Sequence, residues 1–160
     1  MTISEKIERI HNIPKLISEL RCDRDRLLSV GAICYDKNDS SHGSQNNGTE
    51  SSILSFVEYG NKIESLIQER TELVKEVQEE INSTITGEDK DSIDKREIVK
   101  QHLIGVCDGK LDDESKREKP FIRLTLKHIA AKVVFRDYKQ VRNLYKLACE
   151  QLKISYSKPP

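Results

Sequence analysis

Apolar residues in the first segment, residues 3–30, recur at the spacing of an amphipathic helix. The repeating positions are Ile3, Ile7, Ile10, Ile13, Ile17, Leu20 and Leu27. Pro14 interrupts this pattern. Asn12 is a suitable cap and proline fits a first helical turn, so a new helix is predicted to start near Ile13. Arg24 breaks the apolar seam, so it is expected near the end of a partner helix or beside a carboxylate.

A second, longer helix is predicted from Ser52 to about Ile85. Its seam positions alternate between three and four residues apart, which is typical of a coiled-coil-like contact. The seam consists of Phe56, Gly60, Ile63, Ile67, Arg70, Val74, Val77 and Ile81, and Leu66 and Leu73 widen it. The opposite face is rich in Glu and Lys, which predicts a solvated surface.

Polar and small residues fill the segment between these helices, so residues 36–52 are predicted to form a disordered loop. A helix, a polar loop and a second helix predict a long antiparallel hairpin over residues 1–86. The shorter first helix covers only part of the second. The remaining apolar stripe is expected to pack on the C-terminal unit or on a second copy of the chain, and the latter implies a homodimer.

A second domain is predicted over residues 92–155, and it starts with a third helix. Ser92 is expected to cap this helix, whose apolar residues are spread between Ile93 and Val106. The charged residues 108–119 predict a loop. That loop lacks the ligand alternation and the central glycine of an EF-hand, so no calcium site is expected.

The C-terminal segment predicts two short helices joined by a turn near Val134–Asp137. Thr125 is expected to cap the first helix, and the second is expected to begin near Tyr138. The predicted inward residues are Leu126, Ile129, Ala130, Val133, Val141, Leu144, Tyr145, Ala148 and Leu152. The predicted fold class is therefore all-α, with a long coiled-coil-like helical hairpin followed by a small C-terminal helix-turn-helix bundle.

The formal net charge is zero, but the charges are unevenly distributed along the chain. From Pro120 onward nine basic residues face two acidic ones, a net charge of +7, and residues 1–119 therefore carry −7. A basic segment on an acidic body is typical of a protein that meets nucleic acid at one end. A solvated basic face is the alternative interpretation.

The second short helix carries side chains that suit duplex DNA, because Arg, Asn and Gln can make paired hydrogen bonds to base edges in the major groove. The candidates for base or groove contacts are Gln140, Arg142, Asn143 and Lys146. The candidates for neutralising phosphates are Lys127, Lys132, Arg136 and Lys139. Helical packing beneath an ordinary basic surface remains the alternative.

Residues 124–133 (LTLKHIAAKV) and 141–148 (VRNLYKLA) resemble the last helix-turn-helix of sigma-70-type factors. In layout, most of the chain is similar to ArpU-like and DUF1492-like late-transcription regulators of phages and prophages. The resemblance implies a sequence-specific DNA-binding transcription regulator that binds double-stranded DNA and contacts RNA polymerase. The family turn usually holds Gly where this chain has Val134, the turn is one residue longer, and the charged insertion 108–119 is extra.

Other classes of function have little support in the sequence. The cysteines are Cys22, Cys34, Cys107 and Cys149. None of them forms a C-x-x-C pair, and charged residues interrupt the first apolar positions, so reduced thiols and a cytoplasmic location are expected. The histidines lack ligand spacing and no phosphate-binding glycine loop is present, so we expect no metal, no cofactor and no enzyme activity.

No apolar run approaches the roughly 20 residues of a membrane span, so no membrane contact is expected. The remaining competitor is a helical adaptor that acts by protein–protein contact through the long heptad helix.

Overall fold

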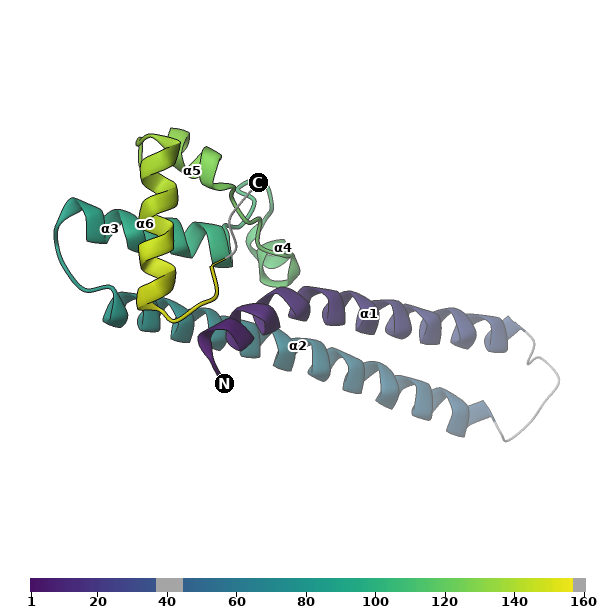
Figure 1. Cartoon of the computed structure of the whole chain (residues 1–160). Coiled ribbons are helices and arrows are strands. Elements are labelled where there is room, and N and C mark those ends of the chain that lie inside the picture. The colour runs from purple at the N-terminus through teal and green to yellow at the C-terminus, as the bar shows by residue number, and fades with distance from the viewer. Residues whose placement is uncertain (37–44, 157–160) are drawn as a thin grey trace. The chain divides into compact units, whose positions relative to one another are not determined.

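The computed structural model describes residues 1–36 and 45–156, and side chains within 1–28 and 53–156. The described elements are α1 (Ile3–Asp36), α2 (Gln45–Thr84), α3 (Lys90–Val99), the π-helical turn η1 (Lys100–Ile104), α4 (Asp113–Glu118), α5 (Leu126–Lys132) and α6 (Tyr138–Gln151), as Figure 1 shows. An isolated antiparallel bridge joins Val106 to Ile122, and the described residues form no strand. The all-α class is therefore confirmed for this part of the chain.

Helix α1 continues through Pro14, so the prediction that a new helix starts near Ile13 is wrong. A proline inside a helix removes a hydrogen bond and costs roughly 3 kcal/mol. Ile10, Ile13 and Ile17 are nearly inaccessible to solvent and lie on one helical stripe. Burying each such side chain contributes about 1.5–3 kcal/mol, so keeping the stripe in register through Pro14 offsets the lost bond.

Helix α2 begins at Gln45, before the expected start at Ser52, so the second part of the predicted loop 36–52 is helical. Asp36 likewise belongs to α1. Residues 37–44 of the predicted loop lie outside the described residues. The extension is possible because no proline stands between Gln45 and Ser52, and an existing helix gains one hydrogen bond for each residue added.

The chain divides into two compact units. Their boundaries differ from the single domain boundary that the sequence predicts between residues 86 and 92. Unit 1 comprises residues 1–12 and 70–160, and unit 2 comprises residues 13–69. Unit 1 therefore contains the first turns of α1 and the last turns of α2 as well as all later helices. Lys6 links those two helices within unit 1, because its Nζ lies 3.0 Å from Glu76 and 3.7 Å from Glu80.

Unit 2 contains the remaining parts of α1 and α2. Its described buried residues include Ile13 and Ile17 from α1 and Ile63 and Ile67 from α2. The Arg24 guanidinium lies 4.9 Å from the centre of the Phe56 ring, a cation–π distance. Arg24 thus breaks the seam by packing on an aromatic ring, and the structure places no described carboxylate at ion-pair distance from it.

The core of unit 1 forms where α6 packs against α3 and α5, and Figure 1 shows α6 crossing α3. Ile98 and Val99 contribute from α3, Ile129 from α5, and Val141 from α6, and all four are almost fully buried. The predicted inward residues of α5 and α6 are likewise buried, except for Val133, which is partly exposed. Spacing along the sequence therefore predicts the inner faces of these two helices.

The caps of α3 and α4 correct two expectations. Asp89 caps α3 by accepting a hydrogen bond from the backbone N–H of Ser92 at 3.2 Å, so Ser92 is not the cap. Within the predicted loop 108–119, Asp112 caps α4 by accepting from the backbone N–H of Ser115 at 2.6 Å. In both cases an aspartate three residues ahead of a serine satisfies a free donor of the first turn.

Arg70 shows why a charge lies in the apolar seam of α2. Its guanidinium is buried and donates hydrogen bonds to the backbone oxygens of Lys119 at 2.6 Å, Lys116 at 3.0 Å and Arg117. Its Cζ also lies 4.7 Å from the centre of the Phe121 ring. These carbonyl groups have no helical partner at the end of α4, so Arg70 supplies one. Burial lowers the pKa of Arg70.

Candidate nucleic-acid interface

The two short helices that precede the C-terminus form as the sequence predicts. Thr125 caps α5, and its hydroxyl accepts a hydrogen bond from the backbone N–H of His128 at 3.2 Å. Residues 133–137 form the turn, and α6 begins at Tyr138. Because α6 packs on both α3 and α5, one of its faces is fixed to the core and the other is available to solvent.

The turn between α5 and α6 places its left-handed residue at Phe135, where φ is 51°. Val134 is buried and has no positive φ. The backbone N–H of Arg136 donates to the carbonyl of Ala130 at 3.0 Å and closes the turn. The β-branched residue therefore avoids the strained conformation, and Phe135 takes it with a side chain that is 78% exposed.

The outer face of α6 carries most of the predicted DNA-binding residues. Lys139, Asn143 and Lys146 are exposed and stand four and three positions apart, so they form one row along the helix. Gln140 is exposed beside this row, and Arg142 is half-buried. Lys127 and Lys132 are exposed on α5.

Most of these cations are not neutralised within the protein. Among the described residues, no carboxylate lies within ion-pair distance of the following side chains: Lys127, Lys132, Lys139, Arg142 and Lys146. The charges of α5 and α6 are therefore available to an anion that comes from solution.

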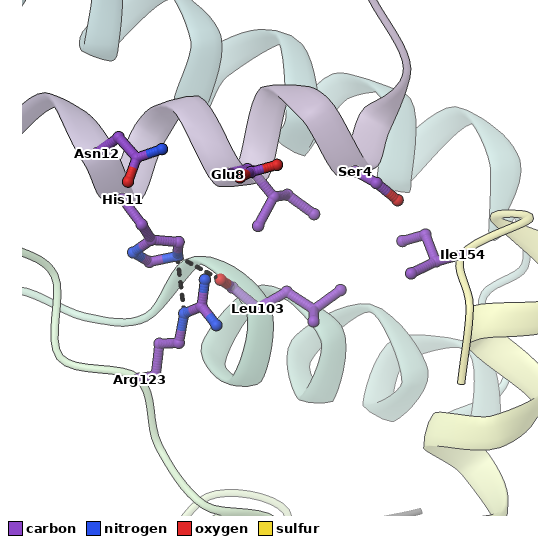
Figure 2. A pocket seen from close by; sticks show the side chains of 8 residues that line it. Ser4, Glu8, His11, Asn12, Leu103, Arg123 and Ile154 are labelled. Atoms are coloured by element: carbon purple, nitrogen blue, oxygen red, sulfur yellow. Dashed lines mark hydrogen bonds between the residues drawn. The ribbon is translucent and has the colours of Figure 1, made fainter. Parts of the chain in front are cut away.

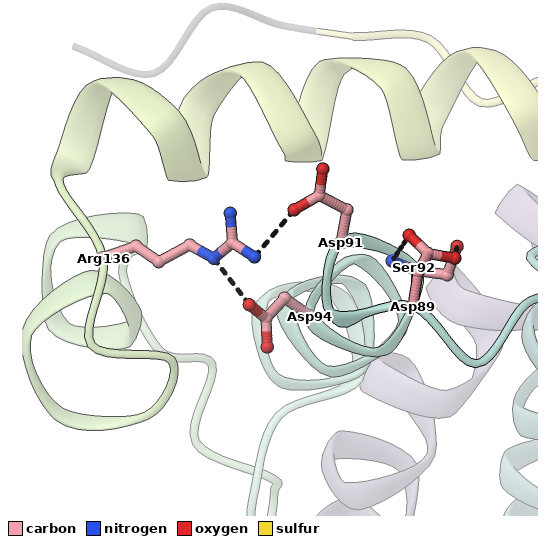
Figure 3. A network of polar contacts seen from close by, with 5 residues as sticks. All are labelled: Asp89, Asp91, Ser92, Asp94 and Arg136. Atoms are coloured by element: carbon pink, nitrogen blue, oxygen red, sulfur yellow. Dashed lines mark hydrogen bonds and ion pairs between the residues drawn. The ribbon is translucent and has the colours of Figure 1, made fainter.

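Arg136 is different, because carboxylates of α3 already pair with it. Its Nε donates to Asp94 at 2.6 Å, and a terminal nitrogen donates to Asp91 at 2.7 Å (Figure 3). The hydrogen bond to Asp91 is the main cause that raises the pKa of Arg136, followed by that to Asp94. Two carboxylates of α3 already neutralise this guanidinium, so Arg136 fixes the turn against α3.

Tyr138 brings two of the remaining cations together. Lys127 Nζ lies 5.7 Å and Arg142 Cζ lies 5.6 Å from the centre of its ring, both within cation–π range. Arg142 Nε is buried and has no hydrogen-bond partner among the described residues. Tyr138 is not among the residues predicted to contact DNA. Its only sequence signal is the spacing of four residues to Arg142, which places both on one helical face.

A cavity of about 370 Å³ lies elsewhere in unit 1 (Figure 2). His11, Arg123, Leu103 and Ile7 are among its lining residues, and none of the predicted DNA-binding residues lines it. His11 Nε2 lies 2.7 Å from the carbonyl oxygen of Leu103 and 2.9 Å from Arg123 Nε. A neutral imidazole nitrogen either donates or accepts, so only one of these contacts is a hydrogen bond at a time. Burial lowers the pKa of His11.

Side chains that commonly bind metals do not gather in the described part of the chain. No group of three or more His, Cys, Asp or Glu residues there is placed to hold a metal ion. None of the described helices combines the length and the apolar composition needed to cross a bilayer.

Comparisons with protein-family models, with the sequences of curated proteins and with solved structures gave no match for this chain.

Proposed function

We propose that the protein is a sequence-specific regulator of transcription that binds duplex DNA by laying α6 in the major groove. One observation carries the proposal: Lys139, Asn143 and Lys146 form an exposed row on a helix whose other face is fixed in the core. The resemblance of residues 124–148 to the last helix-turn-helix of sigma-70-type factors supports the same function and suggests a phage or prophage regulator.

The chemistry of the row fits a base-reading helix. Asn143 and Gln140 carry amide groups that can pair with adenine, and a lysine such as Lys146 can donate to the acceptors of guanine. The major groove is about 12 Å wide and admits one helix. The unpaired Lys127 and Lys132 on α5 suit phosphate contacts beside the groove, where they would release bound counterions.

The distribution of charge supports approach of DNA to this part of the chain. The segment from Pro120 onward carries a net charge of +7, and the rest carries −7. Of the basic residues predicted to contact DNA, only Arg136 is paired with carboxylates among the described residues. An attractive potential is therefore concentrated near α5 and α6, and the acidic remainder disfavours other modes of contact.

Selection from a pool of random duplexes tests the proposal. We expect one enriched sequence motif, because amide and basic side chains on one helix discriminate between base pairs. A Lys139→Ala, Lys146→Ala variant should bind the selected duplex at least tenfold more weakly, since each lost contact contributes about 1 kcal/mol or more. Recovery of no motif, together with no duplex binding at low salt, would contradict the proposal.

A second candidate function is a helical adaptor that acts by protein–protein contact through the long helix α2. Exposed apolar side chains in unit 2 favour it. They are Leu28, Ile53, Leu54 and Val57. An apolar contact of this kind should change little with ionic strength, whereas DNA affinity should fall steeply between low and moderate salt. The salt dependence of partner binding therefore separates the two candidates.

A further inference from the structure

We infer that Lys127, Tyr138 and Arg142 form a clamp for a single backbone phosphate of duplex DNA, and that Arg142 is therefore not a base-reading residue. This phosphate clamp rests on the proposed DNA-binding function and goes beyond it. It identifies the anion that α5 and α6 bind together as one DNA phosphate. It also gives Arg142 a contact with the DNA backbone in place of a contact with a base.

Two cations from different helices converge on one aromatic ring. Lys127 belongs to α5 and Arg142 to α6, yet both charges lie within 6 Å of the ring centre of Tyr138. No described carboxylate lies within ion-pair distance of either cation. Two cations gathered at one ring without a counterion among the described residues favour an anion close to that ring. A phosphodiester supplies one such charge.

The Arg142 guanidinium has a hydrogen-bond donor that no described residue satisfies. Its Nε is buried and lacks a hydrogen-bond partner among the described residues, which leaves a donor unsatisfied in the free protein. That atom is sealed from solvent, so a phosphate would meet the terminal nitrogens of the half-buried guanidinium, which are not among the buried unpartnered atoms. The Tyr138 hydroxyl is a further possible donor to a phosphate oxygen. The clamp thus presents donors and positive charge together.

The Arg142 side chain points back toward the start of α6. Side chains on a helix lean toward its N-terminus, and the Arg142 guanidinium lies at Tyr138, one turn back toward the start of α6. Asn143 and Lys146 remain exposed on the outer row. Packing against the ring engages the Arg142 guanidinium, so Gln140, Asn143 and Lys146 are left to contact bases.

Arg136 provides an internal contrast. It lies in the turn between α5 and α6, and α3 supplies Asp91 and Asp94 to neutralise it. The fold therefore places carboxylates beside the arginine that has a structural role. It places none of the described carboxylates at ion-pair distance from Lys127 or Arg142.

The salt dependence of DNA affinity tests the clamp on the full chain. The logarithm of the binding constant falls with the logarithm of salt concentration, with a slope of about −0.9 for each phosphate neutralised. Lys127→Ala and Arg142→Ala should each reduce the slope by up to about 0.9. Because both residues hold the same phosphate, the double variant should lose no more than about 0.9 in total.

The base preference of the same variants supplies an independent readout. Arg142→Ala should weaken binding to all duplexes by a similar factor and select the same motif as the parent. Asn143→Ala should change the preferred motif. Lys110→Ala removes an exposed lysine outside the clamp and should alter neither the slope nor the motif. Circular dichroism verifies that each variant is folded.

Three outcomes are decisive. A parent that binds no duplex overturns the proposed function and the clamp with it. A parent that binds a motif, combined with a double variant whose slope change clearly exceeds about 0.9, overturns only the clamp. A changed base preference in Arg142→Ala also overturns the clamp and leaves the DNA-binding function intact.

Discussion

At the scale of single residues, the surroundings of a basic side chain determine what it can bind. In the sequence, both Arg136 and Arg142 are candidates for contacts with DNA. Arg136 donates to two carboxylates, whereas Arg142 packs on Tyr138 with an unsatisfied Nε. A charge that is already neutralised has few counterions to release, so only the second arginine can strengthen DNA binding appreciably.

Replacement of Arg136 by alanine should lower stability without changing how DNA binding depends on salt. The change leaves Asp94, whose side chain is 12% exposed, without its partner. An unsatisfied charged group of this kind costs about 1–3 kcal/mol, which a urea titration would measure. Lys132→Ala is the matched control: it should leave stability unchanged and reduce the salt slope of DNA binding. A reversed pattern would refute both assignments.

His11 should make stability depend on pH. Burial, followed by the nearby charge of Arg123, lowers the pKa of His11 in the folded protein. The unfolded chain therefore binds the proton first as pH falls, and the folded state loses stability from about pH 6.5 downward. The urea midpoint of the parent should drop more between about pH 7 and pH 5 than that of His11→Gln. Equal drops would contradict this account of His11.

At the scale of elements, the turn between α5 and α6 contains removable strain. Phe135 has a positive φ and a side chain that is 78% exposed, so it makes few stabilising contacts. Phe135→Gly should raise the free energy of unfolding by about 0.5–1 kcal/mol, which a higher melting temperature would report. Relief of the left-handed strain stabilises the fold, and the greater freedom of glycine in the unfolded chain offsets part of that gain. Phe135→Ala keeps the strain and should change stability little. Destabilisation by Phe135→Gly would show that the ring makes an important contact.

The same elements show which parts of the fold the sequence predicts. The inner faces of α5 and α6 follow from the spacing of apolar residues, because short helices on a core are determined by local periodicity. The Thr125 cap also follows from a local rule. The continuity of α1 through Pro14 and the role of Arg70 do not, because each depends on packing against residues far along the chain.

Prediction of the candidate site was limited in the same way. The exposed row Lys139, Asn143 and Lys146 follows from helical periodicity alone. The exclusion of Arg136 required the position of Asp91 and Asp94, some forty residues earlier in the chain. The inclusion of Tyr138 required the approach of α5, which brings Lys127 to its ring. Sequence patterns locate a surface, but tertiary contacts decide which of its charges are available.

At the scale of the whole molecule, the two proposed functions use different parts of the chain. The unpaired cations lie on α5 and α6 of unit 1, and exposed apolar side chains such as Ile53 and Val57 lie in unit 2. The segment from Pro120 onward carries all of the proposed DNA contacts and a net charge of +7. A single protein could therefore bind DNA through one unit and a partner through the other.

Titration of the full chain with the selected duplex, followed through its backbone amide NMR signals, tests the central claim most directly. The account predicts the largest changes in the residues from Lys139 to Leu147 and around Lys127, and little change from Ile53 to Val57. Loss of these changes at high salt should accompany loss of binding. Signal changes confined to α2 would contradict DNA binding through α6. The absence of any signal change at a saturating concentration of the duplex would contradict it as well.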